Sequence, residues 1–460
     1  MSKFIVMKKN LFFLVILWIL SANVSAQKKY INAGPMLGHV GMTEVWLWIQ
    51  TNAPATVRFA WYPEGHPAQK KFSPKVRTHK ENGYTFKTKL TGLKRGTVYR
   101  YEVYVNGKKI QFPYKLRFKT QDIWRYHKAP ADFSFVFGSG AYINDKPWDR
   151  KGSEYGGHYR IYESIADKHP DFMIWGGDNV YLRQGEWNSK ERVIYRYTHD
   201  RHIPEVQRLL ATVANYAIVD DHDFGPNDSD GSFWNKNTTE EVFRDFWANP
   251  SFGVGNIKGA ITQFSWYDAD FFLLDNRYYR DANKLKTKSP KTMLGKEQLE
   301  WLKNALAASN ARFKFIVMGG QFLNTARRFE TYSNHGFDKE RLDIIDYIYD
   351  QGLKNVIFLT GDRHESEINV FDPSNGDPVI YDITSSPFTS GPNTHAWKEN
   401  NTLRIPGSLI MKRNFAMVSV KGQRENRHVE VSFYDTDGKL IYTYRLDFHK
   451  PVKKIQRRDQ

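Results

Sequence analysis

The chain of 460 residues contains no cysteine. Disulfide bonds are therefore excluded, and so is any metal site built on thiolates. A chain of this length buries enough apolar surface to fold without disulfides. The sequence also lacks a Gly-x-Ser-x-Gly elbow, since Phe-Gly-Ser-Gly at residues 137–140 is too short a match. A phosphate-cradling P-loop is missing as well. These absences disfavour catalysis by a nucleophilic serine.

Long apolar runs are scarce as well, and the run at residues 11–20 lies close to the N-terminus. Two lysines precede it, and small residues at 21–26 provide a cleavage site typical of signal peptides. The run is too short for a comfortable membrane span, and no later segment is long enough either. We therefore expect a signal peptide at residues 1–26 and an exported protein, periplasmic or extracellular. An uncleaved anchor is the alternative.

The net charge is strongly positive, at +17. A basic surface attracts anions such as phosphoesters, nucleic acid or an anionic cell envelope. Good solubility together with a basic tail at residues 450–460 explains the charge equally well. No nucleic-acid recognition motif occurs in the sequence. The charge therefore suits a small-molecule or polymeric phosphoester substrate without indicating a nucleic-acid partner.

Residues 28–120 predict an all-β domain. β-branched and aromatic runs bounded by turn residues are typical of strands, and Asn106-Gly107 is a strong hairpin turn. The segment at residues 90–101 resembles the tyrosine corner of fibronectin type III sandwiches. The expected strands cover residues 45–49, 56–61, 84–90, 98–104 and 114–118. Polar residues 121–130 are expected to form a linker.

Residues 131–449 predict an α/β domain, because apolar strands alternate with amphipathic helices. The expected strands cover residues 133–137, 313–318, 356–359, 416–420, 429–433 and 441–444. The expected helices cover residues 159–168, 204–211, 295–309 and 339–349. Thr-Thr-Glu-Glu at residues 238–241 has the capping-box pattern, so a further helix is expected to begin there.

Three apolar runs of this domain end abruptly in acidic residues. They lead into Gly176-Gly-Asp178-Asn-Val-Tyr181, Asp220-Asp221-His222-Asp223 with Asn227 nearby, and Asp362-Arg363-His364-Glu365. Buried parallel strands are apolar throughout, and ligands bind outside their carboxyl ends. Adjacent acids repel one another unless cations offset their charge. The pattern predicts a pocket for hard metal ions, with the carboxylate of Asp178 bridging two of them.

Each strand end also has an ordinary structural interpretation. Asp178 could cap a helix after a tight turn, and His222 could pair with a carboxylate in a solvated loop. Arg363 could bind a phosphate or only neutralise a neighbouring glutamate. Arg277, after the strand at residues 271–274, could bind substrate oxygens or fix its own loop. The three strand ends together favour a metal-dependent hydrolase over these separate roles.

In their order along the chain, these motifs resemble the alkaline phosphatase D (PhoD-like) family of metallophosphoesterases. The match covers nearly the whole chain after the leader and includes Asp275-Asn-Arg277-Tyr-Tyr-Arg280 and Gln321. The resemblance implies a four-layer α/β metallophosphoesterase-like sandwich behind the fibronectin type III-like domain. It also implies hydrolysis of phosphomonoesters or phosphodiesters with iron(III) and calcium as the two metal ions. The metal ligands that it implies are Asp178, Tyr181, Asp221, Asn227, Asp362 and His364; the residues that we expect to stabilise charge on phosphorus are His222, Arg277 and Arg363.

Two features depart from that family. Its first strand-end motif closes on Ser-Cys, and the cysteine binds iron, whereas this chain has Ser139-Gly140. Glycine offers no side-chain donor, so water or a neighbour such as Asp145 is expected to fill that position, and Mn²⁺, Mg²⁺ or Ca²⁺ could replace iron. The leader also lacks twin arginines, which indicates the general secretory route.

Two other functions compete with a phosphoesterase. If Gly140 disables the site, the chain could be a catalytically impaired relative that binds phosphorylated envelope material through its basic surface. A sulfatase or another ester hydrolase would need the same kind of metal site.

Overall fold

The computed structural model describes residues 30–146, 149, 151–152, 154–373 and 378–448. The expected signal peptide at residues 1–26 and the basic tail at residues 450–460 lie outside the described residues. In the described part of the chain, no helix combines the length and the apolar character that crossing a membrane requires.

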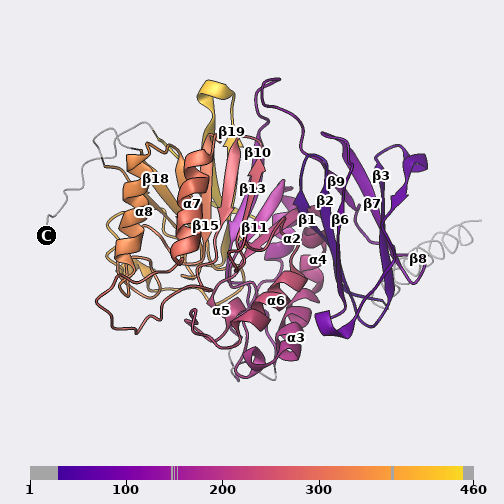
Figure 1. Ribbon diagram of the computed structural model, residues 1–460, viewed down its shortest axis with the longest axis horizontal. Helices are drawn as coiled ribbons and strands as arrows, with labels where there is room; N and C mark the ends of the chain where they lie inside the picture. Colours follow the sequence, from indigo (N-terminus) through magenta and orange to yellow (C-terminus); the bar gives the residue numbers. More distant parts are fainter. Residues whose placement is uncertain (1–29, 147–148, 150, 153, 374–377, 449–460) are drawn as a thin grey trace, which may run out of the picture.

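The described residues form three β-sheets (Figure 1). The first has the strand order β21 (Leu440–Arg445), β20 (His428–Asp435), β19 (Asn414–Lys421), β10 (Phe133–Gly138), β11 (Phe172–Gly176), β12 (Ala214–Ile218), β1 (Ile31–Val40), β2 (Val45–Thr51) and β6 (Thr85–Leu90). The second has the order β13 (Thr262–Trp266), β14 (Ala269–Leu273), β15 (Phe313–Met318), β16 (Val356–Thr360), β18 (Ile380–Thr384) and β17 (Glu367–Phe371). The third has the order β4 (Lys71–Phe72), β3 (Thr56–Pro63), β7 (Val98–Val105) and β8 (Lys108–Lys109), with β5 (Val76–Arg77) on β3 and β9 (Arg117–Lys119) on β7.

Helices cover the outer faces of the first two sheets. The α-helices are α2 (Ile161–Asp167), α3 (Lys190–Arg201), α4 (Pro204–Thr212), α5 (Asp221–Phe224), α6 (Lys236–Phe246), α7 (Lys296–Ala308) and α8 (Asp338–Asp350). Short 3₁₀ helices cover Pro67–Gln69, Lys80–Asn82, Glu186–Asn188, Ala396–Lys398 and Arg424–Asn426. In Figure 1, α7 and α8 lie outside the second sheet, and α2, α4 and α6 lie on the far side of the first. The described α/β region therefore has four layers, helix–sheet–sheet–helix, and the third sheet lies outside them.

Aromatic side chains fill the space between the two central sheets. Phe135 on β10 and Phe172 on β11 stack with their ring centroids 4.9 Å apart. Phe135 meets Phe271 on β14 and Phe315 on β15 edge-on, at 5.2 and 5.3 Å. Offset and edge-to-face contacts of this kind add to the stabilisation from buried area. This packing holds the carboxyl ends of both sheets at the same edge of the molecule.

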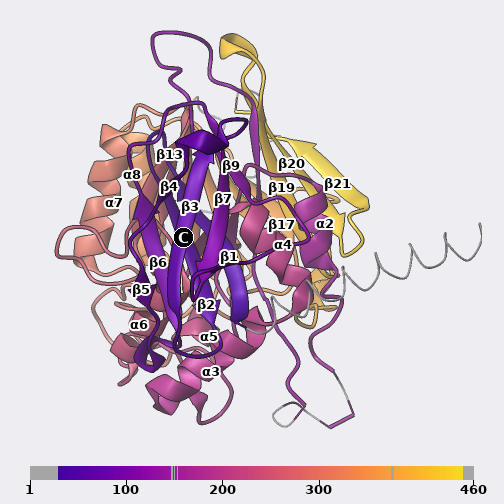
Figure 2. The same ribbon diagram turned by 90° about the vertical axis from the view of Figure 1, so that its right-hand side faces the viewer.

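The N-terminal β region shares a sheet with the α/β region. Strand β1 pairs in parallel with β12 at Leu37 and Ala214, and β2 and β6 extend the same sheet. Figure 2 shows β3 and β7 stacked over β1, β2 and β6 as the other half of the sandwich. The Tyr101 hydroxyl on β7 donates to the carbonyl oxygen of Ala211 in α4, at 2.7 Å. The sandwich is thus continuous with the first central sheet.

The structure agrees with most of the strands and helices that the sequence predicts, with two clear errors. The strand expected at residues 114–118 covers only Arg117–Lys119. The helix expected to begin at residues 238–241 begins at Lys236, and Asn235 precedes it without a side-chain cap. Asn235 instead donates to the carbonyl oxygen of Trp187, at 2.8 Å. Helix α3 was not predicted, because polar side chains such as Arg196 and Asp200 occupy its buried face. Their burial depends on ion pairs that a hydrophobic pattern does not reveal.

Candidate metal centre

Acidic residues from three strand ends meet at one edge of the two central sheets, around α5 at the bottom of Figure 1. Asp178 follows β11, Asp221 follows β12, and Asp362 follows β16. Ligand atoms of Asp178, Asp221 and His222 lie within 4.8 Å of one another. The same limit joins Asp221 to Asp220 and Asp362. Asp221 therefore belongs to both groups, as expected if two cations share this edge.

The backbone is left-handed at three positions of the site. Asp178, Asp362 and His364 have φ angles of +51°, +65° and +57°. Such angles are uncommon for residues other than glycine and concentrate at functional sites. The backbone from Asp362 to His364 therefore turns, and the two side chains reach different neighbours.

The Tyr181 hydroxyl lies between the side chains of Asp178 and His364. The Tyr181 hydroxyl lies 3.0 Å from Asp178 Oδ2 and 3.1 Å from His364 Nε2. On the other side of the ring, His364 Nδ1 lies 2.8 Å from the carbonyl oxygen of Gly391. The tautomer that donates to this carbonyl leaves Nε2 with a free lone pair, which is the usual arrangement of a metal-binding histidine. Burial lowers the pKa of His364 to about 4, so the ring is neutral near pH 7.

The four consecutive ionisable residues after β12 have separate tasks. Asp221 Oδ2 accepts a hydrogen bond from the Asp228 amide at 2.8 Å and lies 4.0 Å from His222 Nε2. Burial alone would raise the pKa of Asp221, but the charges of His222 and Arg277 outweigh it and lower that pKa. Asp223 is structural, because its carboxylate accepts from the Asp220 amide at 3.0 Å and from three further donors.

Arg277 is fully buried behind the acids. Its guanidinium contacts Asp220 Oδ1 at 2.5 Å and Glu330 Oε2 at 2.6 Å, and lies 3.8 Å from Asp221 Oδ1. Arg280 holds the other oxygen of Glu330 at 2.8 Å. Arg277 therefore fixes the acidic loops and has no exposed group for substrate.

Arg363 is buried in a second ion-pair network. It pairs with Glu399 at 2.6 Å and Glu365 at 3.3 Å, and donates to Gln321 Oε1 at 2.8 Å. Of the two roles considered from the sequence, these contacts fit neutralisation of glutamates.

Asn227 is exposed, and its amide nitrogen donates to Asp228 at 2.9 Å. Asp228, one residue further on, is the member of this loop that approaches Asp221 and Glu330. The ligand role of Asn227 stays a prediction.

The donor set fits metal ions. One carboxylate oxygen on each of Asp178, Asp220 and Asp221 is buried without a hydrogen-bond partner among the described residues. Burial, reinforced by the surrounding carboxylates, raises the pKa of Asp178 and of Asp362 well above the ordinary value. Buried acids that lack partners cost free energy unless they are protonated or bind cations. Carboxylate, phenol and imidazole donors suit hard or borderline cations.

Two residues at this edge carry no motif in the sequence. Glu330 lies in the loop after β15, and only its ion pairs reveal it. Ser390 follows β18, and its hydroxyl lies 3.4 Å from His364 Nε2. Neutral residues, most of them Ser and Thr, follow the run at residues 379–383, so the acidic strand-end pattern could not point to Ser390.

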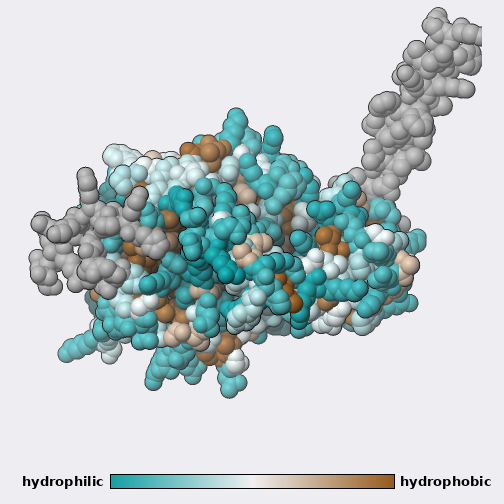
Figure 3. All heavy atoms as spheres, turned by 90° about the horizontal axis from the view of Figure 1, so that it is seen from above, coloured by the Kyte–Doolittle hydropathy of each residue, from teal (hydrophilic) through white to brown (hydrophobic). Residues whose placement is uncertain are grey.

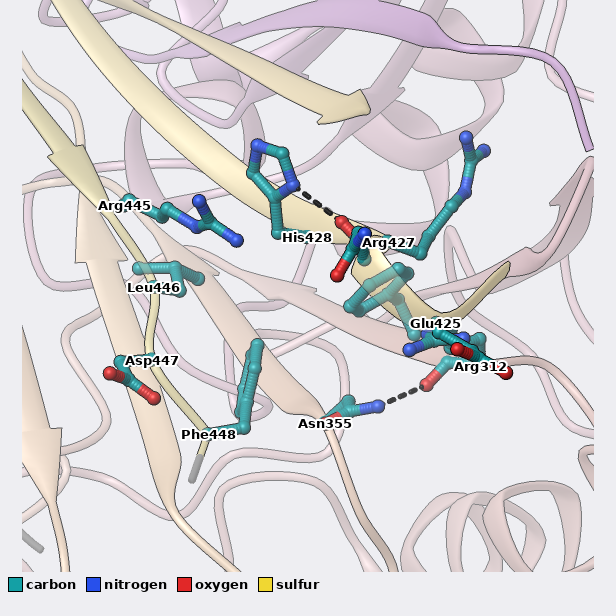
Figure 4. Close-up of a pocket in the computed structure, with 11 residues that line it drawn as sticks. Arg312, Asn355, Glu425, Arg427, His428, Arg445, Leu446, Asp447 and Phe448 are labelled. Carbon is teal, nitrogen blue, oxygen red and sulfur yellow. Dashed lines mark hydrogen bonds between the residues drawn. The ribbon is translucent and has the colours of Figure 1, made fainter. Parts of the chain in front are cut away.

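A separate cavity of about 550 Å³ lies at the opposite, amino ends of β15 and β16. Figure 4 shows Arg312, Asn355, His428 and Arg445 among its lining residues, with Asn355 Nδ2 bonded to the Arg312 carbonyl oxygen at 3.0 Å. Of the described residues that line it, none belongs to the acidic groups. This cavity is not part of the candidate metal centre.

Two sheets packed between helices, with acids at their carboxyl ends, define a metallophosphoesterase-like fold. A solved structure of PhoD matches with a TM-score of 0.71 at 16% identity, over 93% of this chain and 94% of that chain. The purple acid phosphatase PPD1 from yellow lupin (Lupinus luteus) seeds matches with a TM-score of 0.61 at 13% identity, over 89% of this chain and 73% of that one. At such identities the likeness shows the fold alone, and it confirms the predicted fold class.

Sequence comparison finds family matches over parts of the chain. Residues 255–442 match the family model described as PhoD-like phosphatase, and residues 28–123 match a domain of unknown function, DUF7800. Alkaline phosphatase D of Bacillus subtilis (strain 168) is 35% identical over 116 residues, which make up 21% of this chain and 20% of that protein. The match thus spans about a fifth of that relative. Together with the fold, these matches confirm the PhoD-like resemblance.

Proposed function

We propose that the protein is an exported phosphoesterase that hydrolyses phosphomonoesters, phosphodiesters or both at a centre of two metal ions. The observation that carries the proposal is the set of buried carboxylate oxygens without partners on Asp178, Asp220 and Asp221. The PhoD-like family match supports phosphate esters as the substrate class. The leader pattern at residues 1–26 supports export.

Asp178, Tyr181, Asp221, Asp362 and His364 are the residues that would hold the cations. The family resemblance implies iron(III) and calcium as the cations. Because the chain lacks the cysteine that binds iron in that family, Mn²⁺ or Mg²⁺ could replace the iron. When bound, the cations supply Lewis acidity and acidify water for attack on phosphorus.

The side chains around the cations have different tasks. His222 is partly exposed beside Asp221, so its imidazole can contact a substrate oxygen and stabilise charge that develops there. Arg277 and Arg363 are buried in ion pairs and act as positioning residues, because their guanidinium groups hold the acidic loops in place. This assignment revises the direct contact with phosphate that the sequence suggested for both arginines.

The proposal is tested with Asp178→Asn, which keeps the shape of the side chain and tolerates the left-handed backbone. The substrates are an aryl phosphate and a bis-aryl phosphodiester. We expect the wild type to hydrolyse at least one of them, and the variant to hydrolyse it about a hundredfold more slowly, or more slowly still. Asp437→Asn, at an exposed carboxylate, is the matched control. Unchanged hydrolysis in Asp178→Asn would contradict the assignment.

Elemental analysis separates the enzyme from a protein that only binds phosphorylated envelope material. We expect more than one metal ion per chain after incubation with Fe, Ca, Mn or Mg. Less than one ion per chain, together with no turnover, would support the binding protein instead. Aryl sulfates in the same assay test the sulfatase alternative.

A further inference from the structure

A loop after β18 closes over the end of β10. The Ser139 amide donates to the carbonyl oxygen of Ser385 at 3.1 Å, and the Phe388 amide returns a hydrogen bond to the carbonyl oxygen of Ser139 at 2.8 Å. The Ser390 amide donates to the carbonyl oxygen of Gly140 at 3.1 Å. These backbone contacts fix Ser390 directly against Gly140.

Gly140 leaves room for the Ser390 side chain. An ideal Cβ at position 140 would lie 2.9 Å from Ser390 Oγ and 3.1 Å from Pro387 Cβ. The φ angle of Gly140 is +75°, which also disfavours a side chain there. A side chain at position 140 and the hydroxyl of Ser390 therefore compete for the same space.

The Ser390 hydroxyl faces the donors of the metal centre. Ser390 is fully buried, and its Oγ lies 3.4 Å from His364 Nε2. Tyr181, which interacts with Ser390 as well, joins the same nitrogen to Asp178 Oδ2. Four potential ligand atoms from the ends of three strands, β11, β16 and β18, thus converge where the lone pair of His364 points.

We propose that Ser390 is a metal ligand, occupying the position that glycine at residue 140 leaves without a donor. This assignment rests on the proposed function, because it requires a cation beside Asp178, Tyr181 and His364. Asp145, the neighbour considered from the sequence, is bound instead by Arg196 at 3.1 Å and by Tyr195 at 2.9 Å. A neutral hydroxyl adds an oxygen donor without adding charge, so this position favours an oxygen-preferring cation over a soft one.

Cobalt(II) tests the assignment, because its visible spectrum reports the number and kind of its ligands. The purified full chain, freed of metal, is titrated with Co²⁺ as wild type, Ser390→Ala and Thr394→Ala. Thr394 lies in the same segment, is exposed, and loses a hydroxyl in the same way, so it is the matched control. We expect Ser390→Ala to bind Co²⁺ about tenfold more weakly with an altered visible spectrum, and Thr394→Ala to match the wild type.

Ser390→Cys gives a second readout that does not depend on loss of binding. A thiolate at this position should produce a sulfur-to-cobalt charge-transfer band in the near ultraviolet when Co²⁺ is added. Wild-type affinity and spectrum in Ser390→Ala, together with no such band in Ser390→Cys, would overturn the assignment while leaving the proposed function intact. If the wild type binds no Co²⁺, the proposed function fails, and the role of Ser390 fails with it.

Discussion

Arg277→Met tests whether the arginine behind the acids substitutes in part for cations. Methionine keeps much of the volume but removes the guanidinium from Asp220, Glu330 and Asp221. Because all of these groups are buried, the variant leaves uncompensated negative charge away from water. Loss of one partner from a buried ion pair costs about 3–5 kcal/mol, so we expect a clear fall in thermal stability without metal.

Arg427→Met is the matched control. Arg427 is also a buried arginine, and it pairs with Asp268 at 2.8 Å and Asp132 at 3.0 Å, in a different ion-pair network. We expect its loss of stability to be similar, about 3–5 kcal/mol, since the chemistry of the broken pair is the same. The two variants should differ only in how they respond to cations.

Thermal unfolding with EDTA and with Mn²⁺ measures that response. A ligand at a hundredfold excess over its Kd stabilises the folded protein by about 2.7 kcal/mol. Removing a positive charge that lies 3.8 Å from Asp221 should strengthen cation binding about tenfold, which adds about 1.4 kcal/mol to the stabilisation by Mn²⁺. Arg277→Met should therefore recover more of its melting temperature than Arg427→Met. Equal recovery in the two variants would refute the electrostatic argument.

Two further predictions concern packing and pH. In Gly319→Ala the new Cβ would lie 2.4 Å from the carboxyl carbon of Asp220. We expect the free energy of unfolding, measured with urea, to fall by about 1–3 kcal/mol. Wild-type stability in this variant would show that Asp220 shifts freely. Burial, helped by the charge of Lys89 and opposed by that of Glu44, lowers the pKa of His39 to about 4. Stability that is complete above about pH 6.5 should therefore be lost as the pH falls toward 4. Between about pH 7.5 and pH 5 the wild type should lose about 2 kcal/mol more than His39→Gln, and parallel profiles of urea midpoints would contradict this.

The strand ends were predictable because their signal is local. Apolar runs before Asp178, Asp221 and Asp362 predict buried strands, and the carboxyl ends of neighbouring parallel strands meet at one edge. The meeting of ends from two different sheets was not determined by these runs. It depends on aromatic packing such as that of Phe135 against Phe315, which no local pattern specifies.

The roles of the arginines could not be predicted for a similar reason. Arg277 is next to Asp275 and Asn276 in the sequence, but its partner Glu330 lies in a loop after the following strand. Whether a guanidinium is free for substrate depends on which distant acids reach it. Such information is present only in the tertiary structure.

The shape of the metal centre is set by hydrogen bonds rather than by the acids themselves. The strained backbone of Asp362 is held by a hydrogen bond from its amide to Ser139 Oγ, and that of His364 by one from its amide to Ser386 Oγ, both at 3.2 Å. The carbonyl oxygen of Asp178 accepts from the Ala141 amide at 2.8 Å. Because these contacts involve neutral groups, the ligand positions are fixed before any cation binds. The choice of metal then depends on the donors at those positions, and the proposed Ser390 ligand beside Gly140 would favour cations that prefer oxygen.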